Sequence, residues 1–405
     1  MNRKLLMLCS VLMLIMGCGA YYDSWRHVAG LVETFLTDAH LMIYASIFLV
    51  GMIVLTTVIV QMIRLKTWSP MALPFHRSLA LAGAGSSMQL LSGVSDSIYH
   101  SIFGFDVTIW SPPHMGAIFG GVLTGIALTS LWYEQKESML RSFFAIFTIS
   151  VTMFLLQFSI AEYNFGNRFE QYPAWFACFE TLFFGFFVLW FVRKGYKWHA
   201  TFMSLFVWLL QLAIWYLWQP YTPHRDGQVS MYDFPYALFG GVILFELIFW
   251  RFARLGRLGT IISLLASALY FAGLTGWMVW NSGQAYDVEI QLWAIGLACI
   301  GAVIAFVLES VVSGYGERNW RNWFTIRRIP ISSIITLLFP AVLLIFSHVF
   351  ATSVLAHELE PPDRPMRKMA PDMEPWFVVF QFVLQTWLGY GLANLMLQFK
   401  RKATK

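Results

Sequence analysis

Long apolar stretches, separated by short polar segments, run through almost the whole of this chain. Stretches of about 20 residues match the length of a helix that crosses a bilayer. Twelve such segments can be drawn, near residues 4–22, 40–63, 78–100, 114–133, 142–161, 173–192, 199–218, 234–252, 258–280, 289–311, 329–351 and 375–397. Hydrophobic residues make up 58% of the chain and charged residues 12%, which is too apolar for one soluble core. The pattern predicts an all-α fold, a polytopic membrane protein of about 12 transmembrane helices.

Basic residues are distributed unequally between the two ends of these segments. With the N-terminus inside, the inner side holds all but six of the 27 basic residues, and the exceptions are Arg26, Arg168, Arg225, Arg364, Arg367 and Lys368. Short loops rich in Lys and Arg stay in the cytoplasm. The asymmetry therefore predicts that both termini are cytoplasmic and that the chain lies in a bacterial inner (plasma) membrane. The net charge of +5 follows from this topology, so the expected partner is the lipid bilayer and not nucleic acid.

The first apolar segment also has features of a signal peptide, because Asn2-Arg-Lys precedes an apolar stretch that ends at Cys18. An uncleaved first helix keeps the alternation consistent for all twelve segments, so we expect it to be retained. The other three cysteines lie in apolar segments without a C-x-x-C spacing. They are expected to be packing residues rather than disulfides or metal ligands.

Two polar motifs stand 73 positions apart, each at the outer end of a predicted segment. The first is Asp23-Ser-Trp-Arg-His27 followed by His40, and the second is Asp96-Ser-Ile-Tyr-His100 followed by His114. Residues four apart face the same side of a helix. The returning helix brings the last histidine to the mouth of the same hairpin. The repeat therefore predicts a helical hairpin duplicated in parallel orientation.

One carboxylate and two imidazoles form a set that binds zinc or copper and leaves a coordination position open. The predicted metal ligands are Asp23, His27 and His40 in the first copy and Asp96, His100 and His114 in the second. Copper is favoured over zinc or iron, because a site with nitrogen and oxygen ligands in an oxidising compartment suits it. The alternatives are that these residues lie in the headgroup region or cap helices, or that one copy has lost its ion after duplication.

At these residues the chain resembles the membrane C subunit of particulate methane monooxygenase and ammonia monooxygenase, which carries D-x3-H-x12-H at the periplasmic end of a helix. The first copy matches this spacing, and the second is one residue longer. The resemblance implies that the six residues bind copper, or sometimes zinc, at a site implicated in oxidation, with other membrane subunits as partners. It covers the two hairpins only, and the monooxygenase subunit has one motif copy and about half as many spans.

The motifs suggest a division of the chain into residues 1–135, the duplicated hairpins with four spans, and residues 136–405, the other eight spans. Small residues at 82–87 and 116–125 predict that the third and fourth segments pack closely. The Pro-Pro step before His114 restricts the backbone there. Since preorganised ligands bind more tightly, the second copy is expected to be the better-occupied site.

Glu180, Glu246 and Glu309 fall within apolar segments, where charge is expensive. They are expected either to form a proton path to the outer site or to be hydrogen-bonded to neighbouring helices. No Walker or Rossmann motif occurs, so a nucleotide is not an expected partner. The leading hypothesis is a membrane metalloprotein, either a copper-handling subunit or an oxidase- or monooxygenase-like subunit with copper-dependent oxidoreductase activity. The main alternative is a secondary transporter with 12 spans, and a scaffold or assembly protein is a third.

Overall fold

The computed structural model of the protein describes residues 1–28, 37–68, 72–73, 76–103, 112–158, 173–218, 237–252, 256–281 and 288–314. The described residues form ten α-helices: α1 (Arg3–Val28), α2 (Asp38–Arg64), α3 (His76–Phe103), α4 (Pro112–Tyr133), α5 (Met139–Phe158), α8 (Pro173–Arg193), α9 (His199–Trp218), α10 (Phe239–Arg251), α11 (Arg257–Asn281) and α12 (Val288–Gly314). Each of the first ten predicted segments overlaps one of these helices. The last two, 329–351 and 375–397, lie outside the described residues.

Seven helices in the described part are long and apolar enough to cross a membrane, namely α1, α2, α4, α5, α8, α11 and α12. The helix α3 is longer than most, at 28 residues, but its mean hydropathy is lowered by serines, glycines and Asp96. The helix α10 has 13 residues, and α9 contains a shorter apolar stretch. The prediction of an all-helical protein with membrane-spanning helices is confirmed at this level.

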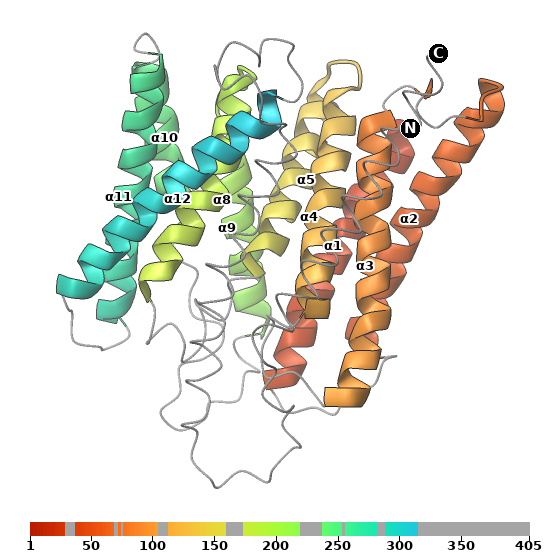
Figure 1. Ribbon diagram of the computed structural model, residues 1–405, viewed down its shortest axis with the longest axis horizontal. Coiled ribbons are helices and arrows are strands. Elements are labelled where there is room, and N and C mark those ends of the chain that lie inside the picture. The colour runs from red at the N-terminus through yellow and green to blue at the C-terminus, as the bar shows by residue number, and fades with distance from the viewer. Residues whose placement is uncertain are drawn as a thin grey trace, which may run out of the picture.

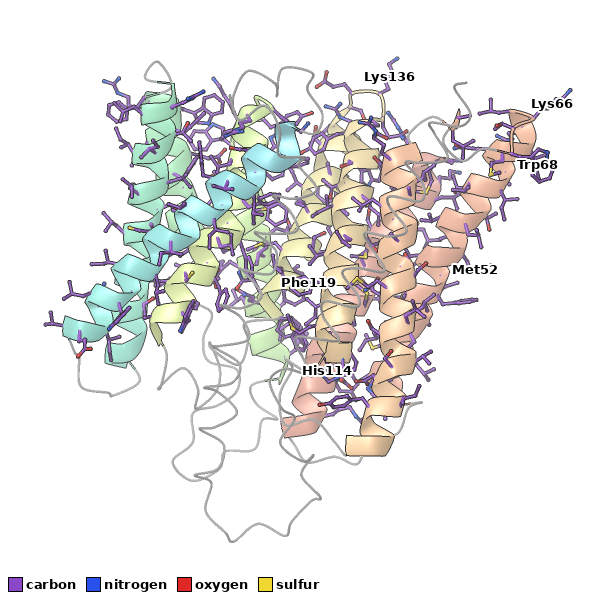
Figure 2. The ribbon with its side chains drawn as sticks, viewed as in Figure 1. Met52, Lys66, Trp68, His114, Phe119 and Lys136 are labelled. Atoms are coloured by element: carbon purple, nitrogen blue, oxygen red, sulfur yellow. The ribbon has the colours of Figure 1, made fainter. Side chains whose placement is uncertain are left out.

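Successive helices run in opposite directions along the molecule (Figure 1). The ends of α1 and α3 lie at the same edge of the bundle as the starts of α2 and α4. Lys66 and Lys136 lie at the opposite edge, far from His114 (Figure 2). The up-and-down arrangement therefore brings both motif copies to one edge and separates them from the basic turns.

The helices enclose two hydrophobic cores, and α5 contributes to both. The first core is built from α1 to α5 and includes Ala145 and Leu155 of α5. The second is built from α5 and α8 to α12, and it includes Ile149 and Met153 of α5. The predicted division at residue 135 stays a prediction, but α5 belongs by its packing to the hairpins as much as to the helices after it.

The first helix is an integral part of the first core. Ser10 of α1 is within 2.7 Å of the Thr148 hydroxyl of α5, and the Trp132 indole of α4 donates to the Ser10 hydroxyl at 3.0 Å. All three side chains are fully buried. Cys9 and Cys178 are also buried, Cys18 and Cys299 are partly buried, and all four are free thiols in the structure.

The third and fourth helices approach each other closely at glycines. A Cβ atom on Gly85 of α3 would stand 2.6 Å from the carbonyl oxygen of Gly120 of α4, and one on Gly120 would stand 2.7 Å from that of Gly85. Real Cβ atoms essentially never come this close to backbone, so neither position accepts a side chain without a shift. The prediction that these two segments pack through small residues is confirmed.

Candidate metal centre

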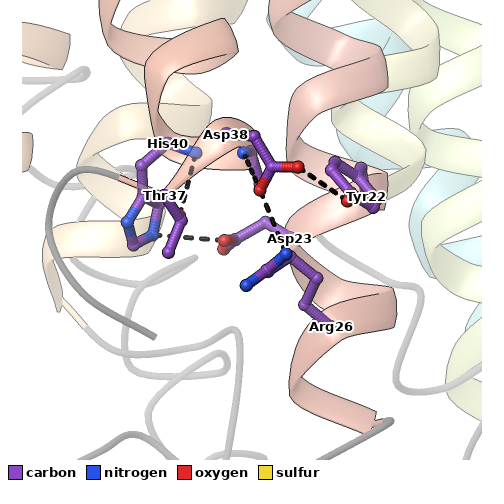
Figure 3. Close-up of polar contacts among 7 residues, drawn as sticks. Tyr22, Asp23, Arg26, Thr37, Asp38 and His40 are labelled. Atoms are coloured by element: carbon purple, nitrogen blue, oxygen red, sulfur yellow. Dashed lines mark hydrogen bonds and ion pairs between the residues drawn. The ribbon is translucent and has the colours of Figure 1, made fainter. Parts of the chain in front are cut away.

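The first motif copy is closed by the start of α2. Thr37 precedes the helix in an extended conformation, and its hydroxyl oxygen accepts a hydrogen bond from the backbone N–H of His40 at 3.4 Å. This cap fixes the first turn of α2, where His40 lies. The His40 ring turns back toward α1, and its Nε2 is 3.2 Å from Oδ1 of Asp23 (Figure 3). Both side chains are 13% exposed.

The second copy repeats this geometry at the start of α4. The helix begins with Pro112, a residue well suited to a first helical position because its fixed φ matches the helix and its missing N–H is not needed there. Nε2 of His114 is 3.3 Å from Oδ1 of Asp96, with the aspartate side chain 8% and the histidine side chain 26% exposed. The same pair of atoms therefore meets at nearly the same distance in both hairpins.

The other two predicted ligands lie one turn further along their helices. His27 belongs to the last turn of α1 and His100 to the last turn of α3, but their side chains lie outside the described residues. The structure thus brings together two of the three predicted ligands in each copy. Among the side chains that it describes, there is no group of three or more His, Cys, Asp or Glu that could hold a metal.

The spacing within each pair fits two ligands of one ion. Bonds of about 2.0–2.2 Å to a tetrahedral ion place two ligand atoms about 3.3 Å apart. The observed separations are 3.2 and 3.3 Å. The facing nitrogen is Nε2 in both copies, one of the two imidazole nitrogens that bind metals. A histidine–aspartate ion pair without metal has a similar length, so the spacing is compatible with a metal but does not require one.

A second polar network, formed by Tyr22, Arg26 and Asp38, lies beside the aspartate–histidine pair of the first copy. Oδ1 of Asp38 is 3.0 Å from Nη1 of Arg26, and Oδ2 accepts a hydrogen bond from the Tyr22 hydroxyl at 2.8 Å (Figure 3). Arg26 lies between Asp23 and His27 in sequence, and a cation there would compete with a metal for Asp23. Pairing with Asp38 holds the guanidinium on another carboxylate. The sequence motif did not reveal this network, because Asp38 belongs to neither predicted ligand set.

The two copies are related by a contact between equivalent residues. Met16 precedes Asp23 by seven positions on α1, and Gln89 precedes Asp96 by seven positions on α3. The Gln89 amide donates to the Met16 sulfur at 2.9 Å, and both residues are buried. Seven residues are about two turns, so each aspartate lies on the same face of its helix as the residue that makes this contact.

The fourth helix, α4, packs against the same contact between Met16 and Gln89. A Cβ on Gly121 would stand 2.9 Å from the Gln89 amide nitrogen and 3.3 Å from the Met16 methyl group. His114 precedes Gly121 by seven residues, and therefore faces the same side of α4. Asp23, Asp96 and His114 are accordingly placed on the helix faces that meet in the interior of the hairpin pair.

The three buried glutamates are each bound to a neighbouring helix. Glu246 of α10 accepts from the backbone N–H groups of Trp198 and Thr201, both at 3.0 Å, and so caps the start of α9. Glu309 of α12 is 2.6 Å from Nη1 of Arg193 on α8. Glu180 of α8 accepts from Gln157 of α5. Glu246 and Glu309 lie toward the edge with the basic turns, away from both motif copies.

Comparison with known proteins gave no match to a family model, to a curated protein or to a solved structure. The described part of the chain defines a class, an all-helical protein with seven helices able to cross a membrane. Within this class, its distinguishing feature is a duplicated hairpin with an aspartate–histidine pair at the same position in each copy.

Proposed function

We propose that the chain is a multi-pass protein of a bacterial inner membrane, with about 12 spans and both termini in the cytoplasm. The alternating direction of ten helices supports this topology (Figure 1). The position of Lys66 and Lys136 at the edge opposite to His114 supports the assignment of that edge to the cytoplasm (Figure 2). In this orientation both aspartate–histidine pairs face the periplasm.

In this proposal the protein is a metalloprotein with an outward-facing Asp/His/His site in each hairpin. The ligands are Asp23, His27 and His40 in one copy and Asp96, His100 and His114 in the other. The single observation that carries the proposal is the repeated separation of 3.2 and 3.3 Å between histidine Nε2 and aspartate Oδ1 at equivalent positions. Headgroup anchoring alone would give no reason for both hairpins to form the same internal pair.

Copper is the proposed metal, with zinc or iron as the alternatives, because two imidazoles and a carboxylate on the oxidising side of the membrane suit it. Bound copper would supply one-electron redox chemistry at the outer surface. The aspartates would contribute the negative charge that offsets the charge of the ion. The Thr37 cap of α2 and the Pro112 start of α4 would hold the two second histidines in place. Together with the monooxygenase-like spacing, this supports an oxidase- or monooxygenase-like subunit, or a copper-handling subunit, acting with other membrane subunits.

The test is the metal content of detergent-purified protein, measured by mass spectrometry after growth with copper, zinc and iron. We expect His114→Ala to lower the amount of bound metal, and His40→Ala added to His114→Ala to lower it further. His199→Ala is the matched control, because that ring lies at the basic edge, where it contacts the Lys197 carbonyl and neighbouring aromatic rings and interacts electrostatically with Glu246. Unchanged metal content in both outer variants would remove the proposed site.

The two copies are separated by titrating metal-stripped protein. Asp96 is more buried than Asp23, and the Pro-Pro step fixes the approach of His114. We expect the tighter binding phase to disappear in Asp96→Ala and to persist in Asp23→Ala. Loss of all binding in Asp23→Ala, with Asp96→Ala silent, would reverse this order and identify the copy with the 12-residue spacing as the working one.

A further inference from the structure

A buried acid in the second core takes no part in the metal sites. Glu180 lies in α8, two turns from the outer end of that helix, and none of its surface is exposed. Within the described part of the chain, its polar contact is with Gln157 of α5, whose amide nitrogen donates to Oε2 of Glu180 at 2.7 Å. Gln157 is 1% exposed. An isolated carboxylate in such a place would be very costly, so its charge has to be compensated or removed.

No described side chain supplies a compensating positive charge. Arg193 is the nearest basic residue on α8, and it lies 13 residues further along, or about 20 Å at 1.5 Å per residue. The helices α1 and α4 also pack on α5, and at the outer edge they carry Asp23, Arg26, His27 and His114; Arg26 pairs with Asp38, and His114 pairs with Asp96. The other charged groups on the helices packed around α8 and α5 are Arg3, Lys4, Arg141, His199, Glu246, Arg251, Arg257 and Glu309 toward the basic edge, and Glu289 at the exposed start of α12. Neutralisation by an ion pair is therefore not provided within the described part.

Around Glu180 there are more buried hydrogen-bond acceptors than donors among the described residues. Oε1 of Glu180 and Oε1 of Gln157 are both buried and have no donor among the described residues. One proton on Oε1 of Glu180 would change this, since the carboxylic acid could then donate to the amide oxygen while still accepting from the amide N–H. A single added proton thus removes the charge and satisfies both oxygens, as the pairing of buried polar groups requires.

We propose that Glu180 and Gln157 form a buried proton-binding site, in which Glu180 is held as a neutral carboxylic acid paired with the Gln157 carboxamide. The ligand is a proton, taken up and released at Oε1 of Glu180. This site is independent of the metal proposal, because it lies in the other core and shares no residue with either motif copy. It is also the observation that favours the transporter alternative, since buried acids that exchange protons are typical of proton-coupled membrane proteins.

Polar side chains lead from the basic edge toward this site. Thr201 of α9 donates to Glu246 at 2.6 Å, and Ser204 donates to the Thr201 carbonyl at 2.9 Å. The Ser150 hydroxyl of α5 donates to the Met203 carbonyl of α9 at 3.3 Å. Seven residues beyond Ser150 and Ser204 lie Gln157 and Gln211, which are therefore level with each other on parallel helices.

Glu246 provides the matched contrast within the same core. Its carboxylate accepts three hydrogen bonds, from the N–H groups of Trp198 and Thr201 and from the Thr201 hydroxyl, so it acts purely as an acceptor. Glutamine imitates a neutral glutamic acid but not a carboxylate that faces three donors. Glu180→Gln should therefore leave thermal stability unchanged, whereas Glu246→Gln should lower it.

The direct test is infrared difference spectroscopy of the purified full-length protein at neutral pH. We expect a carbonyl band of a protonated carboxylic acid that is absent in Glu180→Gln and retained in Glu246→Gln. Gln157→Leu should shift this band without removing it, because the acid keeps its proton but loses the amide N–H; this variant also serves if Glu180→Gln does not fold. The band should move on transfer to heavy water if the proton exchanges.

Two results would overturn the proposal. One is a wild-type spectrum whose protonated-acid region is unaffected by Glu180→Gln and Gln157→Leu. The other is a wild-type melting temperature that is higher in sodium chloride than in choline chloride at the same concentration, with no such difference in Glu180→Gln. Glu180 would then bind a metal cation as a carboxylate. A melting temperature that is the same in both salts supports the proton as the ligand.

Discussion

The two aspartate–histidine pairs are flanked by different residues, and the differences are correlated. Arg26 and Asp38 form an ion pair beside the first copy. The residues at the equivalent positions of the second copy are Tyr99 and Pro112, so both charges are absent there together. If Asp23 binds a metal as proposed, an arginine beside it is tolerable when another carboxylate holds the arginine. In the proposed metal site, the role of Asp38 would be to hold Arg26 by this ion pair, so that the guanidinium does not compete for Asp23.

This role predicts the effect of Asp38→Asn on the first copy. The released guanidinium should turn to Asp23, which precedes Arg26 by three residues on α1, and metal affinity should fall about tenfold, a typical effect of a residue next to the ligands. The measurement is a metal titration in a His114→Ala background, where only the first copy binds. Arg26→Leu combined with Asp38→Asn should restore the affinity, and a double variant as weak as Asp38→Asn would contradict the explanation.

Another prediction at this scale concerns the cap that Glu246 provides for α9. Glu246→Ala leaves two backbone N–H groups and the Thr201 hydroxyl without their acceptor. Loss of a helix cap costs about 0.5–2 kcal/mol, and burial of the orphaned donors adds to this. We expect a clear fall in melting temperature in detergent. Ser263→Ala is the control, because that buried hydroxyl donates only to the carbonyl of Gly259 in its own helix.

At the scale of elements, the contact between α3 and α4 depends on the absence of side chains. Gly85→Ala would place a Cβ atom 2.6 Å from the Gly120 carbonyl oxygen and should force the helices apart. We expect a loss of about 1–3 kcal/mol in stability, typical of overpacking. Gly273→Ala in α11 is the control, since its Cβ would meet nothing within 4 Å and alanine favours a helix. Equal melting temperatures for the two variants would show that the contact is not as tight as described.

The sequence predicted these elements and part of the site for identifiable reasons. Unbroken apolar length located ten helices, small-residue runs located the contact between α3 and α4, and the repeated motif predicted that each aspartate meets the second histidine of its hairpin. Hydrogen bonds from the buried glutamates to neighbouring helices were one expectation, but the particular partners of Glu246 and Asp38 were not predictable. These contacts join residues on different helices, and a helix that is apolar on every side gives no periodic signal of which face packs against which neighbour.

At the scale of the whole molecule, the two edges of the bundle differ in charge, and this difference predicts sidedness. Trp68, next to Lys66, and Met139, close to Lys136, are 95% and 91% exposed, and Val288 at the start of α12 is 64% exposed. In a background without the native cysteines, Trp68→Cys and Met139→Cys should react with a membrane-impermeant thiol reagent only from the cytoplasm. Val288→Cys should react only from the periplasm. Labelling of all three from one side would contradict the proposed topology.

The contact between Met16 and Gln89 has a consequence for the history of the chain. Residues at the same position of two identical subunits meet only where a rotation axis passes between the subunits. A one-hairpin ancestor would have made this contact with a second molecule of itself. Fusion of two such genes would have freed the halves to diverge, so that a methionine now faces a glutamine, and the Arg26–Asp38 ion pair of one copy corresponds to Tyr99 and Pro112 in the other. The inequality of the two sites is, on this account, the mark of a former homodimer.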